Sequence, residues 1–596
     1  MNFCTRLFNK ITLFTAITCL PQLAQASVHY TLSFPEPEAH YATVSITLDE
    51  RTGDSTDFKL PVWIPGSYMV REFSGNIERF AAAGNLQWKK VSKNCWRVYH
   101  PGRSAITVSY SVYCFELSVR TSFVDHDQGL INGSSVFMYT DDTRDRQCSL
   151  TVIPLVYWKK ISTGLDETDG NPFRRIAENY DRLVDCPVLL GNHISFFFNV
   201  SGIPHEVAMM GKADFDSVRI KKDLAVITKA CMDVFGGSPL KSYTFIVIND
   251  LTSGGGLEHA TSSVLKVDRN AYSAELSYKS FLSLATHEYF HLWLVKRIKD
   301  AALVRLDYDK EMYTTQLWLY EGFTSYYDEY LLHKTGIFSR EDYLKIIAKN
   351  MNACINDAGE PYQSLAEASF DAWVKYYRKN ENSSNSTISY YTKGGMLALI
   401  LNLDLLHRSG GQKSLDDFMK FLYSKYFLSG TTGISDKQLQ SAFETVWGVP
   451  LDTLFADYIY GTVPVDYKRY FSYCGITLNE QDTAANGSGY AGITLKTDQN
   501  GVSVAGVRRG SPAWRDGLYA GDRIIKADTA AAESVAACLK TKKPGDEVIF
   551  RIERRGLITE LMVTLGEDPS RNYDFGYVKK PDALQKKVLH GWLNEK

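Results

Sequence analysis

The feature that most constrains this chain is the run His287-Glu288-Tyr289-Phe290-His291. On a helix, residues four apart project from the same face, so His287 and His291 can hold one metal ion between them. Glu288 is turned about 100° from His287 and can reach a water at the metal rather than the metal itself. The spacing therefore predicts two zinc ligands and a general base. The alternative is a helix with two packed histidines.

The residues around this run favour the metal site. Ser280–Ala285 and Leu292–Val295 are small or apolar, so the helix is expected to be buried, and burying two histidines and a glutamate without partners is costly. Catalytic zinc commonly takes a carboxylate as third ligand. Glu321, in the apolar helical stretch around Gly322, is the best candidate. The alternative is a surface glutamate beside a helix kink.

The N-terminus has the pattern of a secretory signal. Arg6 and Lys10 precede the short apolar run Ile11–Leu20, and Ala24-Gln25-Ala26 offers small residues for cleavage after Ala26. The apolar run is too short to anchor the chain in a bilayer. We therefore expect residues 1–26 to be removed and the product to be periplasmic or extracellular, with no stable membrane span. The alternative is a core element at the true N-terminus.

Charge and cysteine content exclude several classes of protein. The formal net charge of −2 gives no indication of a nucleic-acid partner. Eight of the ten cysteines lie beyond residue 26, scattered and without a CxxC pair. That pattern argues against a cysteine-based zinc site and against a small disulfide scaffold, and it leaves any disulfide pairing open.

Hydrophobic periodicity divides the chain into a multidomain α+β protein. Residues 27–200 alternate in short runs typical of a β-sandwich-like domain. Residues 201–470 begin with strands and continue with helical periods, as in a mixed β/helical domain. Residues 471–489 are expected to be a linker, 490–568 a small domain of short strands, and 569–596 a polar C-terminal tail.

The helical periods of the middle domain place the metal-binding residues. The pattern predicts helices over 277–299, 313–333, 340–352, 394–408, 414–426 and 436–447. The first of these carries His287 and His291, and the second carries Glu321. The expected site thus lies between two neighbouring helices.

Longer motifs resemble the glycyl aminopeptidase family of PDZ-containing zinc metallopeptidases. The resemblance is carried by the zinc-binding run with the residues after it to Ile298, by Trp318–Tyr327, by Trp63–Phe73 and by Ile131–Phe137. That family is related to the aminopeptidase N and leukotriene-A4-hydrolase group, so the resemblance implies a thermolysin-like catalytic domain and one zinc ion per chain. In the wider group fewer residues separate the second histidine from the ligand glutamate. Here 29 residues separate His291 from Glu321, and this longer spacing implies an insertion between the two metal-binding helices.

The resemblance also implies substrate-binding residues. Gly255-Gly256-Leu257-Glu258-His259 is similar to the strand of aminopeptidase N relatives whose glutamate binds the substrate's α-amine and whose backbone pairs with the peptide. Glu258 is therefore expected to hold the amine, with Gly255 and Gly256 beside the peptide. His259 stands where those relatives have asparagine, so its role stays open. Taken alone, the glycines would indicate a flexible turn before an edge strand.

A tyrosine motif completes the implied site. Tyr391-Thr392-Lys393-Gly394 is similar to the motif whose tyrosine donates a hydrogen bond to the oxyanion in these relatives. Tyr390 is adjacent, and the sequence does not decide between the two. Thr324, one helical turn after Glu321, is expected to support a ligand.

The stretch Tyr490–Leu495 and the segment Gly510–Lys526 resemble a PDZ domain. Such domains bind a peptide C-terminus as an added strand. The alternative is a domain that only packs on the catalytic unit.

Together these motifs imply a zinc aminopeptidase that acts on peptides with small N-terminal residues such as Gly or Ala. The competing hypothesis is a PDZ-assisted zinc endopeptidase in extracytoplasmic protein or peptide turnover. The third hypothesis is a peptide-binding protein that has the peptidase fold but no catalytic activity. An amine anchor at Glu258 makes sense only for an exopeptidase.

Overall fold

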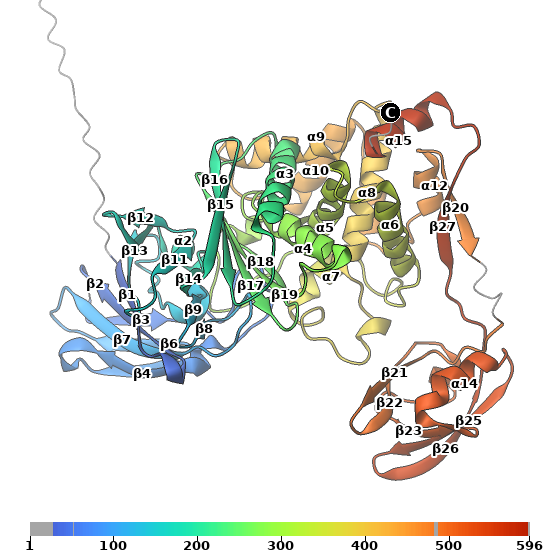
Figure 1. Cartoon of the computed structure of the whole chain (residues 1–596), viewed down its shortest axis with the longest axis horizontal. Coiled ribbons are helices and arrows are strands. Elements are labelled where there is room, and N and C mark those ends of the chain that lie inside the picture. Colours follow the sequence, from blue (N-terminus) through green and yellow to red (C-terminus); the bar gives the residue numbers. More distant parts are fainter. Residues whose placement is uncertain (1–27, 52, 482–486, 594–596) are drawn as a thin grey trace, which may run out of the picture.

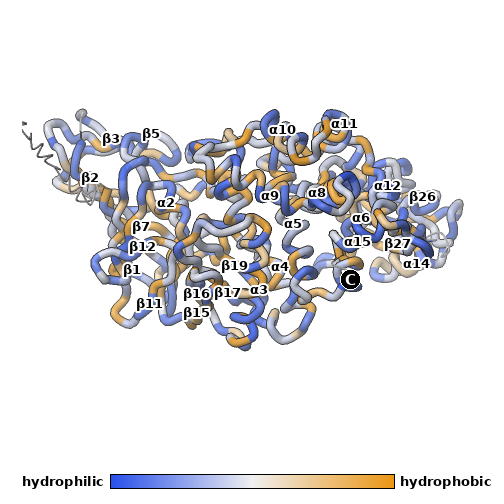
Figure 2. Tube along the Cα trace, turned by 90° about the horizontal axis from the view of Figure 1, so that it is seen from above, coloured by the Kyte–Doolittle hydropathy of each residue, from blue (hydrophilic) through white to orange (hydrophobic). Residues whose placement is uncertain are grey.

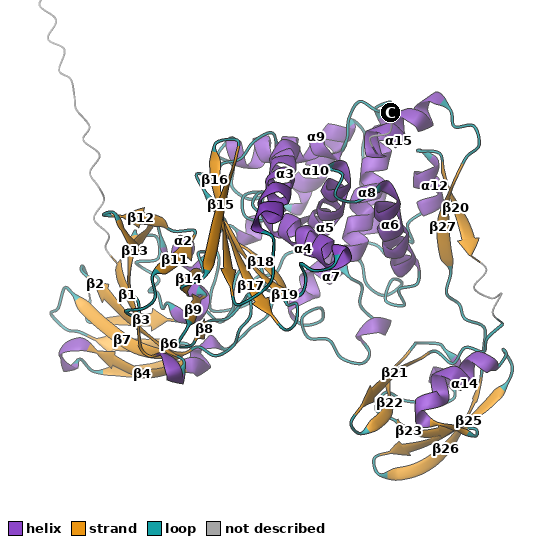
Figure 3. Cartoon of the chain, viewed as in Figure 1, coloured by secondary structure: helices purple, strands orange, loops and turns teal. Residues whose placement is uncertain are grey.

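The computed structural model describes residues 28–51, 53–481 and 487–593, and the expected signal segment 1–26 lies outside them. A strand-rich N-terminal domain and a small C-terminal domain lie at opposite ends of the molecule, with a largely helical domain between them (Figure 1). Figure 3 shows the same division by secondary structure. The multidomain α+β organisation predicted from the sequence is confirmed.

The N-terminal domain packs its sheets around one apolar core. Along strand β1, buried and partly exposed residues alternate, as expected when one face of a strand meets a core. A seven-stranded sheet has the order β12-β13-β10-β1-β2-β7-β4, a four-stranded sheet β11-β14-β9-β8, and a three-stranded sheet β3-β6-β5. The strands and helices of this domain are β1 (Val28–Glu36), β2 (Tyr41–Leu48), β3 (Ser55–Lys59), β4 (Ile77–Ala82), β5 (Trp88–Ser92), β6 (Cys95–Tyr99), β7 (Ile106–Tyr113), β8 (Phe123–Val124), β9 (Gln128–Ile131), α1 (Gly133–Val136), β10 (Cys148–Ile153), β11 (Lys160–Thr163), β12 (Asp166–Thr168), β13 (Asn171–Ala177), α2 (Tyr180–Val184) and β14 (Val188–Gly191).

The boundary expected after residue 200 falls inside a hairpin of the middle domain. Strands β15 (Ile194–Val200) and β16 (Ile203–Met210) pair antiparallel through the turn at Ser201-Gly202. Val200 is buried in the core of the middle domain. The middle domain therefore begins with β15, a few residues before the expected boundary.

The middle domain combines one sheet with a helical body. Its sheet has the order β15-β16-β17-β19-β18, and β18 is an edge strand antiparallel to β19. Figure 2 shows the hydropathy along the chain, with apolar residues interspersed among polar ones in the same elements. The remaining strands and the helices are α3 (Ser217–Phe235), β17 (Tyr243–Asp250), β18 (Gly255–Glu258), β19 (Ser262–Asp268), α4 (Glu275–Phe290), α5 (Leu317–Lys334), α6 (Arg340–Ile355), α7 (Leu365–Phe370), α8 (Tyr390–Arg408), α9 (Leu415–Tyr423), α10 (Asp436–Trp447), α11 (Asp452–Leu454) and α12 (Tyr467–Ser472).

Helix α4 is shorter than the sequence predicts. The pattern predicts a helix over 277–299, but α4 stops at Phe290, with His291 as its C-cap. Val295 has a φ of 89°, which a β-branched residue rarely adopts and which no helix contains. The backbone N–H of Val295 donates to the carbonyl of Ile298 at 3.0 Å, closing a tight loop. The chain therefore turns away directly after the second histidine.

Two glycines let helices α5 and α8 touch. A Cβ on Gly322 would overlap the backbone of Gly394, and a Cβ on Gly394 would overlap the backbone at Trp318. Only glycine permits this approach. Gly322 follows Glu321, and Gly394 lies within the motif of Tyr391. The contact therefore fixes the two polar side chains relative to each other.

The C-terminal residues return to the middle domain. Strand β20 (Ile476–Gln481) lies in the expected linker 471–489, and it pairs with β27 (Asn572–Tyr577). Helix α15 (Ala583–Leu593) then packs against α8. Its Trp592 is fully buried in the middle-domain core, so residues 569–596 are not only a polar tail. The segment differs from the predicted polar tail because α15 has an apolar face that packs into this core.

The C-terminal domain is inserted between β20 and β27. Its sheet has the order β21-β22-β23-β25-β26 around a separate core. It meets the middle domain at Asn385, whose amide donates to the Val507 carbonyl and accepts from the Arg509 N–H, both at 2.8 Å. Its elements are β21 (Ile493–Asp498), β22 (Gly501–Val507), α13 (Pro512–Arg515), β23 (Arg523–Ala527), β24 (Ala530–Ala531), α14 (Val535–Thr541), β25 (Glu547–Arg554) and β26 (Leu557–Thr564).

Two further observations concern the described residues as a whole. None of their helices is both long and apolar enough to cross a bilayer. The eight cysteines beyond residue 26 are all free thiols here, and seven of them are buried.

Candidate active site

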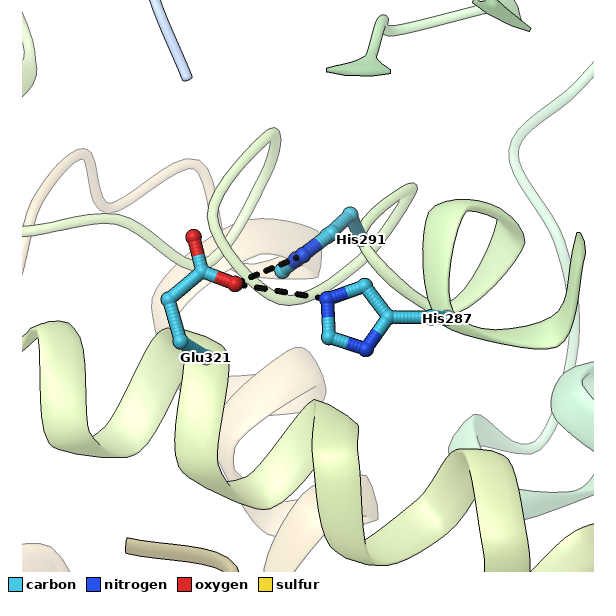
Figure 4. A group of neighbouring side chains, drawn as sticks. All are labelled: His287, His291 and Glu321. Atoms are coloured by element: carbon cyan, nitrogen blue, oxygen red, sulfur yellow. Dashed lines mark hydrogen bonds and ion pairs between the residues drawn. The ribbon is translucent and has the colours of Figure 1, made fainter. Parts of the chain in front are cut away.

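The two predicted histidines and Glu321 converge between helices α4 and α5. Oε2 of Glu321 lies 3.4 Å from Nε2 of His287 and 3.2 Å from Nε2 of His291 (Figure 4). The three donor atoms lie within 4.8 Å of one another. Glu321 and His291 are buried, and His287 is nearly so. The long spacing between the two helices thus does not prevent the ligand set from forming.

The outer ring nitrogens are held by hydrogen bonds. Nδ1 of His287 lies 2.8 Å from the Asp328 carboxylate, and Nδ1 of His291 lies 3.0 Å from the carbonyl of Leu294. Both partners accept a hydrogen bond, so each histidine carries its proton on Nδ1 and presents the Nε2 lone pair to the centre. This orientation is the one that a metal ligand requires.

Sequence reasoning missed Asp328 and pointed to Thr324 instead. The Thr324 hydroxyl donates to the backbone carbonyl of Tyr320 at 2.6 Å and so does not support a ligand. Asp328 lies two helical turns after Glu321, so both project from one face of α5. The spacing of two helical turns between Glu321 and Asp328 could have indicated Asp328 from the sequence.

The donor set fits zinc. Two imidazoles and one carboxylate are the ligands of many catalytic zinc sites, which leave a fourth position for water or substrate. All three donors here point to one centre, and their hydrogen-bonded partners fix that geometry. The residues present can therefore hold the metal that the motif predicts.

Two further carboxylates border this centre. An oxygen of Glu288 and one of Glu258 lie within 4.8 Å of each other and of a His291 nitrogen. Burial raises the pKa of Glu288 to about 7; Glu258 adds to this, while the two histidines oppose it. For Glu321 the order is reversed: burial alone would raise its pKa, but His291 and His287 hold it below the ordinary value. The two glutamates are thus suited to different tasks, Glu288 to proton transfer and Glu321 to staying charged.

Two glycines allow the backbone to touch these carboxylates. A Cβ on Gly256 of β18 would overlap the side chain of Glu288. A Cβ on Gly66, in a loop of the N-terminal domain, would overlap the carboxylate of Glu258, and Gly66 has a φ of 89°. Strand β18 therefore runs flush against the general-base candidate, while the N-terminal domain abuts Glu258.

The end of β18 is anchored by Asp185. Its carboxylate accepts from the Ala260 N–H at 2.9 Å, contacts Nδ1 of His259 at 3.1 Å and pairs with Nζ of Lys296 at 2.7 Å. Burial alone would raise the pKa of Asp185, but Lys296 and His259 hold it well below the ordinary value. His259, whose role the sequence left open, thus helps to fix the strand next to Glu258.

The adjacent tyrosines have different surroundings. Tyr391 lines the cavity, and its ring centroid lies 6.3 Å from that of His287. Tyr390 is fully buried beside it, and its hydroxyl has no hydrogen-bond partner within the described chain. Tyr377, which the sequence did not indicate, also lines the cavity. Of the two candidates, only Tyr391 faces the metal ligands.

All eight site residues proposed from the sequence line one cavity of about 340 Å³. The other lining residues come from the N-terminal domain, from helices α4 and α5 and from the segment between α7 and α8, and among them Arg120 and Tyr377 carry polar groups that a substrate can contact. The full lining is Gly66, Arg120, Gly255, Gly256, Glu258, Ser280, Ser283, Leu284, His287, Glu288, His291, Glu321, Asp328, Tyr377 and Tyr391.

Comparison with known proteins agrees with this geometry. Residues 29–192 match the Peptidase M61 N-terminal domain, 280–397 the M61 glycyl aminopeptidase model and 489–565 the PDZ domain. No curated protein sequence matches the chain.

Among solved structures, an aminopeptidase N family protein from Idiomarina loihiensis is similar over 94% of this chain and 100% of its own, with 33% identity and a TM-score of 0.88. An M1 zinc metallopeptidase from Deinococcus radiodurans is similar over 74% of this chain and 94% of its own, with 15% identity and a TM-score of 0.47. With the family-model matches, the similarity to the Idiomarina loihiensis protein and the converging ligand set, the chain belongs to the M61 glycyl aminopeptidase family and is a zinc metallopeptidase with a PDZ domain.

Proposed function

We propose that the protein removes single residues from the N-terminus of peptides, with one zinc ion per chain and a preference for small residues such as Gly or Ala. The observation that carries the proposal is the position of Glu258. Its carboxylate lines the cavity of the metal ligands and abuts Gly66 of the neighbouring domain. A free α-amine would meet a fixed negative charge there. The preference for small residues rests on the description of the matching family model.

The chain's own residues supply binding and proton transfer. A zinc ion held by His287, His291 and Glu321 would supply Lewis acidity, which polarises a carbonyl and acidifies water. Glu288 accepts the proton of the attacking water and passes it to the leaving amine, a task for which its raised pKa is suited. The hydroxyl of Tyr391 donates a hydrogen bond to the carbonyl oxygen as negative charge develops on it.

Strand β18 positions the peptide. It is the edge strand of its sheet, so its outer backbone groups are available to pair with an extended substrate. Gly255 and Gly256 leave no side chain between that backbone and the cavity. The substrate backbone can therefore lie against β18, with its amine at Glu258 at the end of the strand.

We also propose that the protein acts outside the cytoplasm. The support is the basic, then apolar, then small-residue pattern of residues 1–26. N-terminal sequencing of the exported protein is expected to begin at Ser27. A mature chain that keeps residue 1 would contradict export by this signal.

The function is tested with a panel of aminoacyl p-nitroanilides and their N-acetylated forms. Free glycyl and alanyl substrates are expected to be hydrolysed, and acetylated ones not, because acetylation removes the charge that Glu258 binds. Equal cleavage of both forms would rule out the aminopeptidase and favour the PDZ-assisted endopeptidase. Activity that survives both chelation and Glu288→Gln would rule out the zinc mechanism.

A further inference from the structure

A positively charged side chain from the N-terminal domain reaches the active-site cavity. Arg120 lines it together with Tyr377 and Tyr391. Apart from the two histidine ligands, the other ionisable side chains that line the cavity are these tyrosines and four carboxylates. None of the site's proposed functions uses a positive charge at this position.

Arg120 has no acidic partner. In the part of the chain that the structure describes, no carboxylate forms an ion pair with it, and its buried Nε lacks a hydrogen-bond partner. Two of the cavity's carboxylates, Glu321 and Asp328, are already engaged by His287 and His291. Desolvating part of a guanidinium without a counter-charge is unfavourable, so the site is better suited to an arriving anion.

A second arginine reinforces this charge. Arg71 donates from Nη2 to Ser67 Oγ at 2.7 Å, and its own buried Nε has no partner among the described residues. Burial and the charge of Arg120 lower the pKa of Arg71, while Glu116 and Tyr377 oppose this shift. Arg71 and Arg120 both interact electrostatically with Tyr377, which lines the cavity together with Arg120. Glu116 is the acid that acts on Arg71, and within the described residues no carboxylate forms an ion pair with either arginine, so the pair carries an excess of positive charge.

We propose that Arg120, with Arg71 behind it, binds the free C-terminal carboxylate of a short peptide whose α-amine lies at Glu258. This inference rests on the proposed aminopeptidase function and adds a second anchor to it. Two extended residues span about 7 Å, which a cavity of about 340 Å³ accommodates. The protein is thereby a peptidase for dipeptides and tripeptides rather than for long chains.

The test compares peptides that differ only in the C-terminal charge. Glycylglycine and glycylglycinamide are assayed with wild type, Arg120→Gln, Arg120→Lys and Arg174→Gln, the last a control at an exposed arginine of the same domain. The wild-type kcat/KM is expected to favour the free acid by about tenfold to a hundredfold, the range of one charge-assisted hydrogen-bonded pair. Arg120→Gln is expected to bring the ratio close to one, Arg120→Lys to keep part of it, and Arg174→Gln to keep all of it.

A binding measurement separates recognition from turnover. In the Glu288→Gln background, calorimetry is expected to give the same preference for the acid as the kinetics, and Arg120→Gln is expected to remove it. If wild type hydrolyses alanyl p-nitroanilide but treats acid and amide alike, the C-terminal anchor is refuted while the aminopeptidase stands. If wild type does not hydrolyse the anilide, the proposed function itself fails.

One further pair identifies the source of the carboxylate. Glycyl-aspartamide and glycyl-asparaginamide carry the charge, or its neutral isostere, on a side chain instead of the C-terminus. Arg120→Gln is expected to leave the ratio between them unchanged. A loss of discrimination confined to this pair would overturn the assignment to the C-terminus.

Discussion

Replacing Gly66 by alanine tests the amine anchor from the opposite side of the domain interface. The added Cβ would overlap the Glu258 carboxylate, so one of the two must move. Moving Glu258 away from the amine removes a charge-assisted hydrogen bond of about 1.5–3 kcal/mol, which corresponds to roughly a tenfold to hundredfold loss in kcat/KM. Because the amine is charged before and during the reaction, the loss should appear mainly as a higher KM.

Backbone strain must be separated from this effect. Gly66 has a φ of 89°, and an alanine in the left-handed region costs about 1–2 kcal/mol of stability wherever it stands. Gly102 has a φ of 73° and no atom within 4 Å of an added Cβ, so Gly102→Ala carries the strain without the contact. Both variants are assayed on alanyl p-nitroanilide and by thermal unfolding. If Gly66→Ala matches Gly102→Ala in kcat/KM, Glu258 does not hold the amine.

Three more predictions concern the metal ligands, the tyrosine pair and the C-terminal helix. Asp328→Asn should weaken zinc retention about 10- to 100-fold in a chelator competition, because an amide replaces the charged carboxylate that supports His287; unchanged retention would contradict its role. Tyr391→Phe should lower kcat about a hundredfold or more, whereas Tyr390→Phe should leave it near wild type, since the Tyr390 hydroxyl makes no hydrogen bond within the described chain; the reverse result would exchange the two assignments. Trp592→Ala should destabilise the middle domain by about 3–5 kcal/mol in denaturant unfolding, because it empties a fully buried site; a loss below about 1 kcal/mol would show that α15 is not part of that core.

The active site was largely predictable because its spacing is local. His287, Glu288 and His291 lie within one helical turn or so, where the period of the helix fixes their relative directions. Glu321 lies on another helix, yet an acid in an apolar period is rare enough to stand out. The family motifs added Glu258 and Tyr391, and the structure places both at the same cavity.

The residues that were missed depend on contacts between distant segments. Arg120 and Gly66 reach the cavity from the N-terminal domain. Gly66 lies in the motif Trp63–Phe73, but neither that motif nor the sequence around Arg120 indicates an approach to the metal ligands. The end of α4 likewise depends on the left-handed Val295, because the apolar period itself continues beyond it. Tertiary contacts and local backbone conformation decide these points, and sequence periodicity reports neither.

The position of α15 changes how the chain can be divided. The PDZ domain enters and leaves through β20 and β27, which are paired neighbours, so its two attachment points lie side by side. A deletion of the inserted residues closed by a short turn would leave a β-hairpin and keep Trp592 in the core. Truncation from the C-terminus would instead strip the core first and the PDZ domain second. The PDZ domain can thus be removed without changing the core of the peptidase, whereas the last helix of the chain is part of that core.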